Sequence, residues 1–286
     1  VEARWGGANQ ERALVSIVET GSGPWVLHAD AFGRQTDDLQ VPSFKRPVDG
    51  GFVIRDRVLN SASRTEGGAV GGSWMGRDGF VGLAAETYRN AYGTVVEDDV
   101  QIRMNRDRVS GAFEFEKLPG WLRTVRGQAA NTQYQHQEVS GSGEVGTTFK
   151  VSGTDARVEA VQQEVQSSSM SWDGTLGAQV EASRFSALGL EAFLPSTSTD
   201  HAAAFVLQRL RWTHGLEFNA GLRQEDVKVG SSGDGLGTTT GATRFGPAVS
   251  RRFGPRSQSM GLIHKLDAHW QWSLNCLLYT SPSPRD

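Results

Sequence analysis

Cysteine is nearly absent from this sequence: the chain of 286 residues has one, Cys276, close to the C-terminal end. A disulfide framework, a zinc or iron–sulfur site with cysteine ligands and a cysteine nucleophile are therefore excluded for the rest of the chain. Hydrophobic residues make up only 37% and the mean hydropathy is −0.40, which is low for a thick core. The aromatic content of 9% nevertheless indicates an ordered protein and not a disordered one.

Long apolar runs and a strong charge of one sign are also missing. No run approaches the roughly 18 residues of a membrane helix. The formal net charge is −3 and the pI is near 6.1, with acidic and basic residues interspersed along the chain. We therefore expect neither a transmembrane helix nor a nucleic-acid partner.

Catalytic motifs are absent as well. The stretch GSGEVG at 141–146 fits a dinucleotide-binding pattern, but it runs into TTFKV, another predicted strand, so no helix N-terminus is available for a pyrophosphate. Ser73 in GGSWMG lacks the spacing of a nucleophile elbow. No metalloprotease motif, phosphate-binding loop or pair of catalytic carboxylates is found. We therefore expect no enzyme and no cofactor.

What the sequence does contain is a recurring two-residue alternation. In LEFNAGLR, Leu216, Phe218, Ala220 and Leu222 share one face, and polar residues or glycine occupy the other. This period is typical of β-strands, and many of the segments exceed the five or six residues usual in soluble sheets. About thirteen strands are predicted, at 1–7, 11–20, 23–34, 66–76, 79–89, 99–117, 120–138, 147–166, 169–187, 199–213, 215–228, 240–253 and 258–274.

The predicted connections alternate in length. Short turns such as Arg77-Asp78 and Leu118-Pro119 alternate with long segments rich in Gly, Ser, Asp and Thr. The long segments are 35–65, 90–98, 139–146, 188–198 and 229–239. An antiparallel meander with short connections at one rim and long connections at the other is typical of outer-membrane barrels, which have tight periplasmic turns and long extracellular loops.

The two faces of the strands agree with this interpretation. In a bilayer a closed sheet satisfies its own backbone, its outward face is apolar and its interior is polar. Five tryptophans near predicted strand ends are candidates for an interfacial girdle: Trp25, Trp121, Trp212, Trp270 and Trp272. The fold class expected is all-β, an antiparallel up-and-down transmembrane β-barrel of which this chain holds only part.

The last eleven residues, CLLYTSPSPRD at 276–286, resemble the direct translation of a transposase sequencing adapter. We expect them to be an adapter-derived tail that does not pair with the sheet, because it is rich in proline. The native protein is then expected to continue beyond Asn275.

Several longer stretches resemble one known family. These are VEARWGG with NQERALVSIVETGSGPWVLHADAFGRQTDDLQVPSF near the start, YQHQEVSGSGEVGTTFKVSGTDARVEA at 134–160 and FSALGLEAFLPSTSTDHAAAFVLQRLRW at 185–212. They resemble strand–loop–strand units of TonB-dependent outer-membrane receptors, including the branch of zinc and iron-chelate receptors. The shared elements are E-x-G-T-x-F (Glu144 to Phe149) and E-A-F-x-P (Glu191 to Pro195).

The resemblance covers residues 1–275 and implies the N-terminal part of a 22-stranded barrel, about thirteen strands of it, in the outer membrane of a Gram-negative cell. It implies contact with membrane lipid and uptake of a metal or metal chelate, such as zinc or a ferric siderophore. It also implies a partner, the TonB complex, which acts through an N-terminal plug not contained in this sequence.

Candidate ligands for a metal substrate lie near the predicted extracellular rim. His136 and Glu138 are two residues apart and so share one side of a strand, while Glu97, Asp98 and Asp99 form an acidic triplet. Imidazole and carboxylates suit zinc or another divalent ion. The alternative is that these are solvated loop residues. Asp200-His201 is a similar pair, and Asp37 and Asp38 are interpreted as loop residues.

Three hypotheses of function follow. The first is a TonB-dependent receptor fragment for active uptake of a metal or metal chelate. The second is a passive porin-like barrel, which would have no plug. The third is a soluble or cell-surface β-rich binding protein, which the alternation of short and long connections disfavours.

Overall fold

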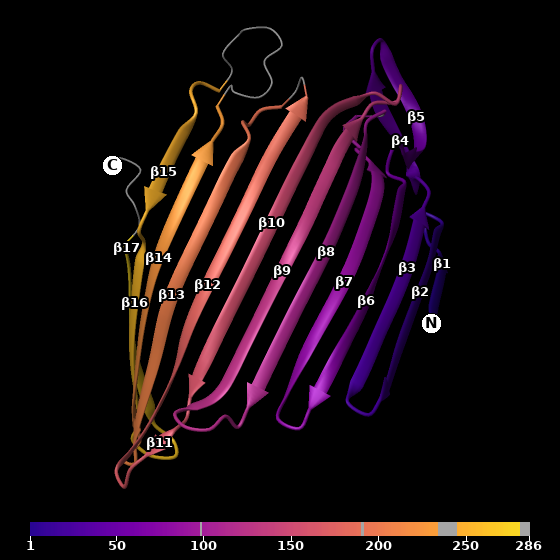
Figure 1. Cartoon of the computed structure of the whole chain (residues 1–286). Helices are drawn as coiled ribbons and strands as arrows, with labels where there is room; N and C mark the ends of the chain where they lie inside the picture. Colours follow the sequence, from indigo (N-terminus) through magenta and orange to yellow (C-terminus); the bar gives the residue numbers. More distant parts are fainter. Residues whose placement is uncertain (98, 190–191, 234–244, 281–286) are drawn as a thin grey trace.

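A computed structural model of the chain describes residues 1–97, 99–189, 192–233 and 245–280. Every regular element in these ranges is a β-strand (Figure 1). No helix within the described part of the chain is long and apolar enough to cross a membrane. The all-β fold predicted from the alternation is confirmed.

Thirteen strands follow one another in a single antiparallel sheet, each beside its neighbour in this order. They are β1 (Glu2–Gly6), β2 (Glu11–Ser22), β3 (Trp25–Thr36), β6 (Ser63–Gly76), β7 (Gly79–Gly93), β8 (Gln101–Glu116), β9 (Leu122–Val139), β10 (Val145–Gln162), β12 (Met170–Gly189), β13 (Thr197–Trp212), β14 (Leu216–Ser231), β16 (Arg256–Lys265) and β17 (Gln271–Thr280). Two short strands pair at the margins, β11 (Val165–Gln166) with β12 and β15 (Val249–Phe253) with β14. This is the predicted up-and-down order.

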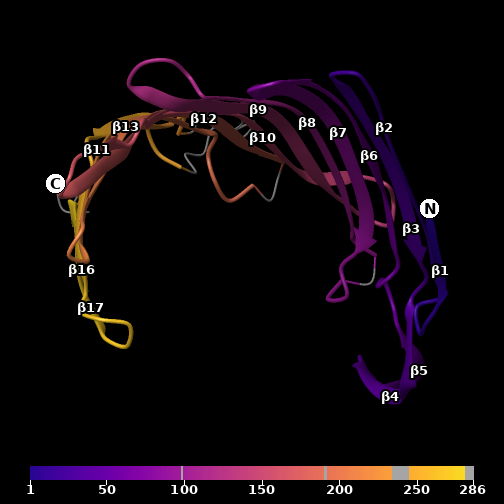
Figure 2. The same ribbon diagram turned by 90° about the horizontal axis from the view of Figure 1, so that it is seen from below.

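The sheet is strongly curved and open. Seen along the strands it forms an arc, with β1 to β3 at one end and β16 and β17 at the other (Figure 2). The longest strand, β12, has 20 residues. An arc of long antiparallel strands in sequential order is part of an up-and-down barrel wall.

Connections at the two ends of the sheet differ in length, as predicted. Short turns lie at one end, the lower one in Figure 1, and we call it the turn end: 23–24, 77–78, 117–121, 213–215 and 266–270 join neighbouring strands there, as does 163–169, which holds β11. The opposite end, which we call the loop end, has the connections 37–62, 94–100, 140–144, 190–196 and 232–248 and the short link 7–10.

The first long connection is not an irregular loop. It holds a separate two-stranded sheet, β4 (Leu39–Val48) paired with β5 (Gly51–Val58), which projects from the loop end (Figure 1). Asp38 closes its base: its Oδ1 accepts hydrogen bonds from the backbone N–H groups of Ser61 (2.9 Å) and Ala62 (3.1 Å). The loop role predicted for Asp38 is therefore refined to a closing contact, and the hairpin was missed.

The C-terminal strands differ from the prediction. The single strand predicted at 258–274 is wrong: β16 ends at Lys265 and the chain reverses into β17. The Oδ1 atom of Asp267 accepts hydrogen bonds from the backbone N–H groups of His269 (2.7 Å) and Trp270 (2.9 Å), which builds the turn. Alternation continues across the turn, and a two-residue period does not reveal where a strand reverses.

The strand predicted at 240–253 is represented by β15 alone, and residues 234–244 lie outside the described residues. β15 pairs with the loop-end half of β14, and β16 pairs with the other half. Pro255 lies between them and has no N–H to donate, so the ladder is interrupted there, and its carbonyl accepts the Glu225 N–H instead. The gap between the strands predicted at 240–253 and 258–274 is thus a break between two strands that share one neighbour.

The predicted tail is partly in the sheet. Residues 276–280 continue β17 and pair with β16 from Met260 to Arg256, against the expectation that they do not pair. Backbone pairing requires no particular side chains, and the first proline of the tail comes after Thr280. Residues 281–286 lie outside the described residues.

Candidate functional site

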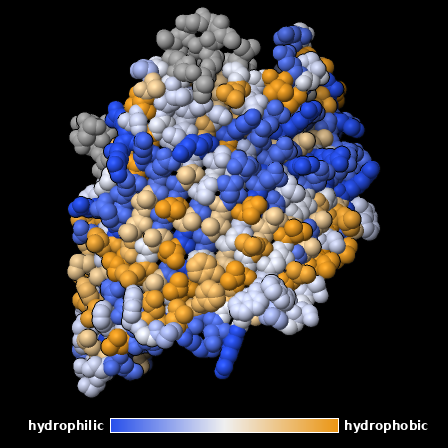
Figure 3. All heavy atoms as spheres, viewed as in Figure 1, coloured by the Kyte–Doolittle hydropathy of each residue, from blue (hydrophilic) through white to orange (hydrophobic). Residues whose placement is uncertain are grey.

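The two faces of the sheet are chemically opposite. The face turned to the viewer in Figure 1 is the convex one, and it carries a broad apolar belt across its lower half (Figures 2 and 3). Exposed side chains of this belt come from successive strands: Val18, Leu27, Val70, Leu83, Val109, Val158, Val180, Leu222 and Met260. In water, so large an exposed apolar surface is unfavourable, whereas in a bilayer it is the surface that contacts hydrocarbon.

The height of this belt matches a membrane. On β12 the outward residues from Trp172 to Ala182 are apolar or glycine. Ten residue steps cover about 33 Å along the strand, or about 25 Å once a barrel tilt of about 40° is included. We call this the apolar band.

The band is staggered relative to the strand register. The strand register places Val18 on β2 in the same row as Val70 on β6, Thr154 on β10 and Lys228 on β14. The same register row is thus apolar at the start of the sheet and charged near its end, where the apolar residues lie closer to the turn end. If the band keeps a constant height across strands paired with this stagger, the strands must be tilted from the direction perpendicular to the band. Tilted strands are the geometry of a closed barrel.

Tryptophans mark the turn end. All five predicted girdle residues lie there: Trp25 begins β3, Trp121 is in the turn before β9, Trp212 ends β13, and Trp270 and Trp272 lie in and just after the turn between β16 and β17. Four of them are well exposed, with Trp25 at 60% and Trp270 at 71%. Indole rings at one edge of an apolar band are typical of a membrane interface.

The concave face is polar, and several of its charges form ion pairs. Glu159 is the centre of one group, where it accepts hydrogen bonds from Arg126 (2.6 Å) and Arg157 (2.5 Å) with its side chain only 12% exposed. Asp173 lies between Arg209 (2.9 Å) and Arg211 (3.2 Å) in a second group. These ion pairs lie at the level of the apolar band but on the opposite face, as expected for a water-filled interior.

Histidines join the same face. His28 contacts two carboxylates, Glu19 at 3.1 Å and Asp30 at 2.9 Å. His201 lies between Glu181 (3.9 Å) and Glu225 (3.4 Å). The predicted pair Asp200-His201 therefore does not act as a unit, because Asp200 faces the convex side and binds Arg184 at 2.7 Å.

Guanidinium groups also stack on an aromatic ring of the concave face. The Cζ atom of Arg157 lies 4.6 Å from the centre of the Phe205 ring, and that of Arg223 lies 5.9 Å from it. Both guanidinium groups are also ion-paired, Arg157 with Glu159 and Arg223 with Glu225. The concave wall thus carries arginines that stack on an aromatic ring and pair with carboxylates.

An aromatic cluster occupies the concave face at the loop end. The Phe149 ring is 4.5 Å from the His136 ring, 6.4 Å from Phe185 and 6.0 Å from Phe193. Phe149 is only 8% exposed and packs with Ala187 and Ala192 in the main buried group of the described residues. We call Tyr134, His136, Phe149, Phe185 and Phe193 the aromatic cluster.

The two family-like motifs meet in this cluster. Thr147 and Phe149 come from E-x-G-T-x-F and are buried, and Ala192 and Phe193 come from E-A-F-x-P. Glu191 lies outside the described residues. The spacing of the two motifs in the sequence does not predict this contact, because the contact depends on the pairing of β10 with β12.

His136, a predicted ligand, is held within the cluster beyond the apolar band. Its Nδ1 is 3.0 Å from the Tyr134 hydroxyl, and burial lowers the pKa of its imidazole below the ordinary value. The ring is therefore neutral at neutral pH and keeps Nε2 as its second polar atom. Glu138 lies two residues further along β9 on the same face.

The acidic triplet is only partly described. Asp98 lies outside the described residues. Asp99 lies beside the turn that follows β9, where a Cβ on Gly141 would be 3.0 Å from the Asp99 Cβ. Among the described residues no group of three or more His, Cys, Asp or Glu side chains could hold a metal ion, so the predicted ligands form no preassembled metal site there.

Solved structures share this fold. The chain superposes on the open form of the ferric-catecholate import receptor Fiu from E. coli K12 with a TM-score of 0.72 at 12% identity, covering 98% of this chain and 54% of that one. For the hemophore receptor HasR of Serratia marcescens, in complex with its hemophore HasA and heme, the TM-score is 0.69 at 11% identity, covering 92% and 42%. For the copper transporter OprC it is 0.67 at 13% identity, covering 91% and 41%.

No protein-family model matches the chain. At these identities the likeness establishes the fold: the chain has the architecture of part of a large antiparallel β-barrel, and it spans about half or less of the length of these structures. Each of these neighbours is named as a receptor or transporter.

Proposed function

We propose that this chain is part of the barrel of a TonB-dependent outer-membrane receptor that takes up a metal or metal chelate. One observation carries the proposal: an apolar band on the convex face stands opposite an ion-paired, polar concave wall, in a staggered up-and-down sheet with short turns at one end and long connections at the other. A soluble sheet would cover that band with a second layer. The described residues contain none.

The class of substrate that we propose is supported by the names of the neighbours and by the concave face. The similar structures are named for ferric catecholate, ferric citrate, copper, and a hemophore with heme. An aromatic cluster suits a ring-containing chelate better than a bare ion. We therefore favour a metal chelate, with His136 and Glu138 as rim contacts and the aromatic cluster as the surface on which the chelate stacks.

Energy coupling is part of the proposal. A passive barrel would let solutes equilibrate, whereas a receptor requires TonB to act on a plug that lies outside this sequence. The neighbours of similar fold extend well beyond the matched region, which leaves room for such a segment in the full protein.

The test is uptake by the full-length receptor in cells that lack other receptors, with and without TonB. Radiolabelled ferric siderophores and zinc are supplied at submicromolar concentration, and accumulation is measured. Uptake of one chelate that disappears without TonB supports the proposal. Accumulation that is equal with and without TonB and does not saturate would instead show a passive porin. Phe193→Ala, at the exposed ring of the aromatic cluster, with Phe80→Ala as a matched concave-face control outside the cluster, then tests the contact surface.

A further inference from the structure

The hairpin of β4 and β5 projects from the loop end on the β1 side of the sheet (Figures 1 and 2). Among the strands of the described residues, β5 contacts only β4. A turn of two residues, Asp49 and Gly50, joins the two strands, so Val48 and Gly51 exchange both of their backbone hydrogen bonds. From this closing pair onward, the backbone groups of successive residues alternate between the ladder and the outer edge of the hairpin.

The outer edge of β4 is blocked. The nitrogen of Pro47 lies on this edge and has no hydrogen to donate. A bulge follows Gln40, whose own N–H already donates to the carbonyl of Ala8 at 2.8 Å. Proline, a bulge and a covering loop are the devices by which proteins prevent a further strand from pairing with an edge.

The outer edge of β5 has none of these devices. It contains no proline and no bulge, and the alternation places the N–H and C=O groups of Phe52 and Ile54 on the outer side. Apart from the ladder with β4, no hydrogen bond within the described residues involves the backbone of 52–57. An open edge of this kind is a template for one more strand.

The side chains of β5 indicate what an added strand carries. Phe52 and Ile54 lie on one face and are 69% and 74% exposed. Arg55 and Arg57 lie on the other face. Within the described residues Arg55 has no ion pair and its shielded Nε has no hydrogen-bond acceptor, while Arg57 is 3.8 Å from Asp56. Cross-strand neighbours that suit these side chains are apolar on the first face and carboxylates on the second.

Charge and rigidity favour the same partner. Residues 39–58 carry four cationic and two acidic side chains, so the hairpin has a formal charge of +2, whereas the whole chain has −3. The base of the hairpin is fixed, because the amide nitrogen of Asn60 lies 2.7 Å from the carbonyl oxygens of both Glu97 and Val100. A fixed base reduces the entropy that is lost when a partner binds to the edge.

We propose that the β5 edge binds, by strand addition, an extended segment of an extracellular polypeptide in which acidic and apolar residues alternate. The backbone of the segment extends the hairpin to three strands, its apolar residues pack beside Phe52 and Ile54, and its carboxylates pair with Arg55 and Arg57. The inference rests on the proposed function, which places the loop end outside the cell. It adds a docking edge for a polypeptide to the uptake path along the concave face.

The experiment uses the full-length receptor, purified in mild detergent from outer membranes. The probe is a fluorescein-labelled heptapeptide in which glutamate alternates with valine, and its binding is followed by fluorescence anisotropy. Ile54→Pro is compared with Ile54→Ala, because both remove the side chain and only proline removes the edge N–H, which the ladder with β4 does not use. Loss of that one hydrogen bond is expected to weaken binding about fivefold.

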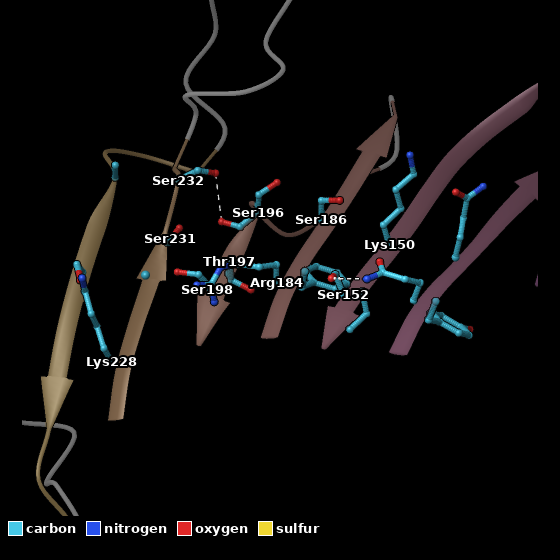
Figure 4. Close-up of a pocket in the computed structure, with 18 of the residues that line it drawn as sticks. Lys150, Ser152, Arg184, Ser186, Ser196, Thr197, Ser198, Lys228, Ser231 and Ser232 are labelled. Carbon is cyan, nitrogen blue, oxygen red and sulfur yellow. Dashed lines mark hydrogen bonds between the residues drawn. The ribbon is translucent and has the colours of Figure 1, made fainter. Parts of the chain in front are cut away.

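A second pair of variants tests the charges. R55Q/R57Q is expected to weaken binding about tenfold, since it removes two exposed ion pairs. The matched control, K150Q/K228Q, also removes two cations from the loop end. Lys150 and Lys228 border a hydroxyl-rich groove over β10 to β14, far along the sheet from the hairpin (Figure 4). This control is expected to bind the peptide as the unmodified receptor does.

The outcomes separate the alternatives. Binding that Ile54→Pro and R55Q/R57Q weaken and K150Q/K228Q leaves unchanged supports the inference. Equal affinity of Ile54→Pro and Ile54→Ala overturns it, as does equal binding of a peptide with its glutamates and valines in separate blocks, which would show general charge attraction. Receptor dimers that Ile54→Pro abolishes would assign the edge to a second copy of the receptor and also overturn it. A receptor that takes up a chelate and binds no peptide refutes only this inference, whereas a receptor absent from the outer-membrane fraction refutes the proposed function.

Discussion

Leu83 and Ala84 are neighbours on β7 that face opposite sides of the wall, and arginine at each position tests which side contacts lipid. Leu83 lies on the convex face in the middle of the apolar band and is 67% exposed. Ala84 lies on the concave face, two residues from Glu86. The two variants L83R and A84R add the same side chain to the same strand, so differences in strand propensity largely cancel.

The expected magnitudes differ widely. Burial of a whole leucine side chain is worth about 1.5–3 kcal/mol, so the exposed two thirds of Leu83 contributes about 1–2 kcal/mol when hydrocarbon covers it. Arginine at the bilayer midplane costs about 2–4 kcal/mol more. We therefore expect L83R to lower the free energy of unfolding by about 3–6 kcal/mol. A84R enters a water-filled interior with a carboxylate in reach and is expected to change it by less than about 1 kcal/mol.

The assay is folding of the full-length receptor into phospholipid vesicles, followed by guanidinium unfolding and by the gel mobility of the folded form. Assembly in the outer membrane of cells provides a second measurement. If L83R were as stable as A84R, the convex face would not contact lipid. If A84R were the more damaging of the two, the assignment of the faces would be reversed and the proposed function would fail with it.

Three other predictions concern the concave face. Phe149→Ala is expected to destabilise the loop end by about 3 kcal/mol, since it empties the centre of the aromatic cluster, and faster proteolysis at 192–196 would report it. Glu159→Gln leaves two guanidinium groups without their shared carboxylate and is expected to cost about 1–2 kcal/mol in guanidinium unfolding, whereas an unchanged midpoint would show solvated, independent charges. His136 has a lowered pKa in the folded state, so its contribution to stability is present above about pH 6.5 and is lost as the pH falls below it. His136→Phe is expected to remove that part of the pH dependence, and an identical pH profile in the variant would contradict the assignment.

The alternation of the sequence was sufficient to predict the wall. A two-residue period places successive side chains on opposite faces, and the lengths of the connections place their ends at two different rims, so the sheet order needed no long-range information. The positions at which the chain turns from one strand into the next were harder to predict from the sequence. Asp267 builds a turn inside an uninterrupted alternation, and β4 and β5 pair within a segment that lacks a clear period, because a hairpin depends on hydrogen bonds that composition does not show.

The candidate site was predicted only in part. The residue types at His136 and Glu138 indicated the loop end, but the contact of His136 with Phe149 did not follow from spacing, because it depends on the pairing of β9 with β10. Phe193 joins the cluster through Phe149, on the return of the chain after β12. The sequence by itself thus determined the all-β class, the opposite chemistry of the two faces and the two unequal rims, all of which depend on local periodicity. The tertiary structure decided which charges pair across the concave wall, which motifs meet in the aromatic cluster and how the apolar band crosses the strands, since each of these depends on strand register and stagger.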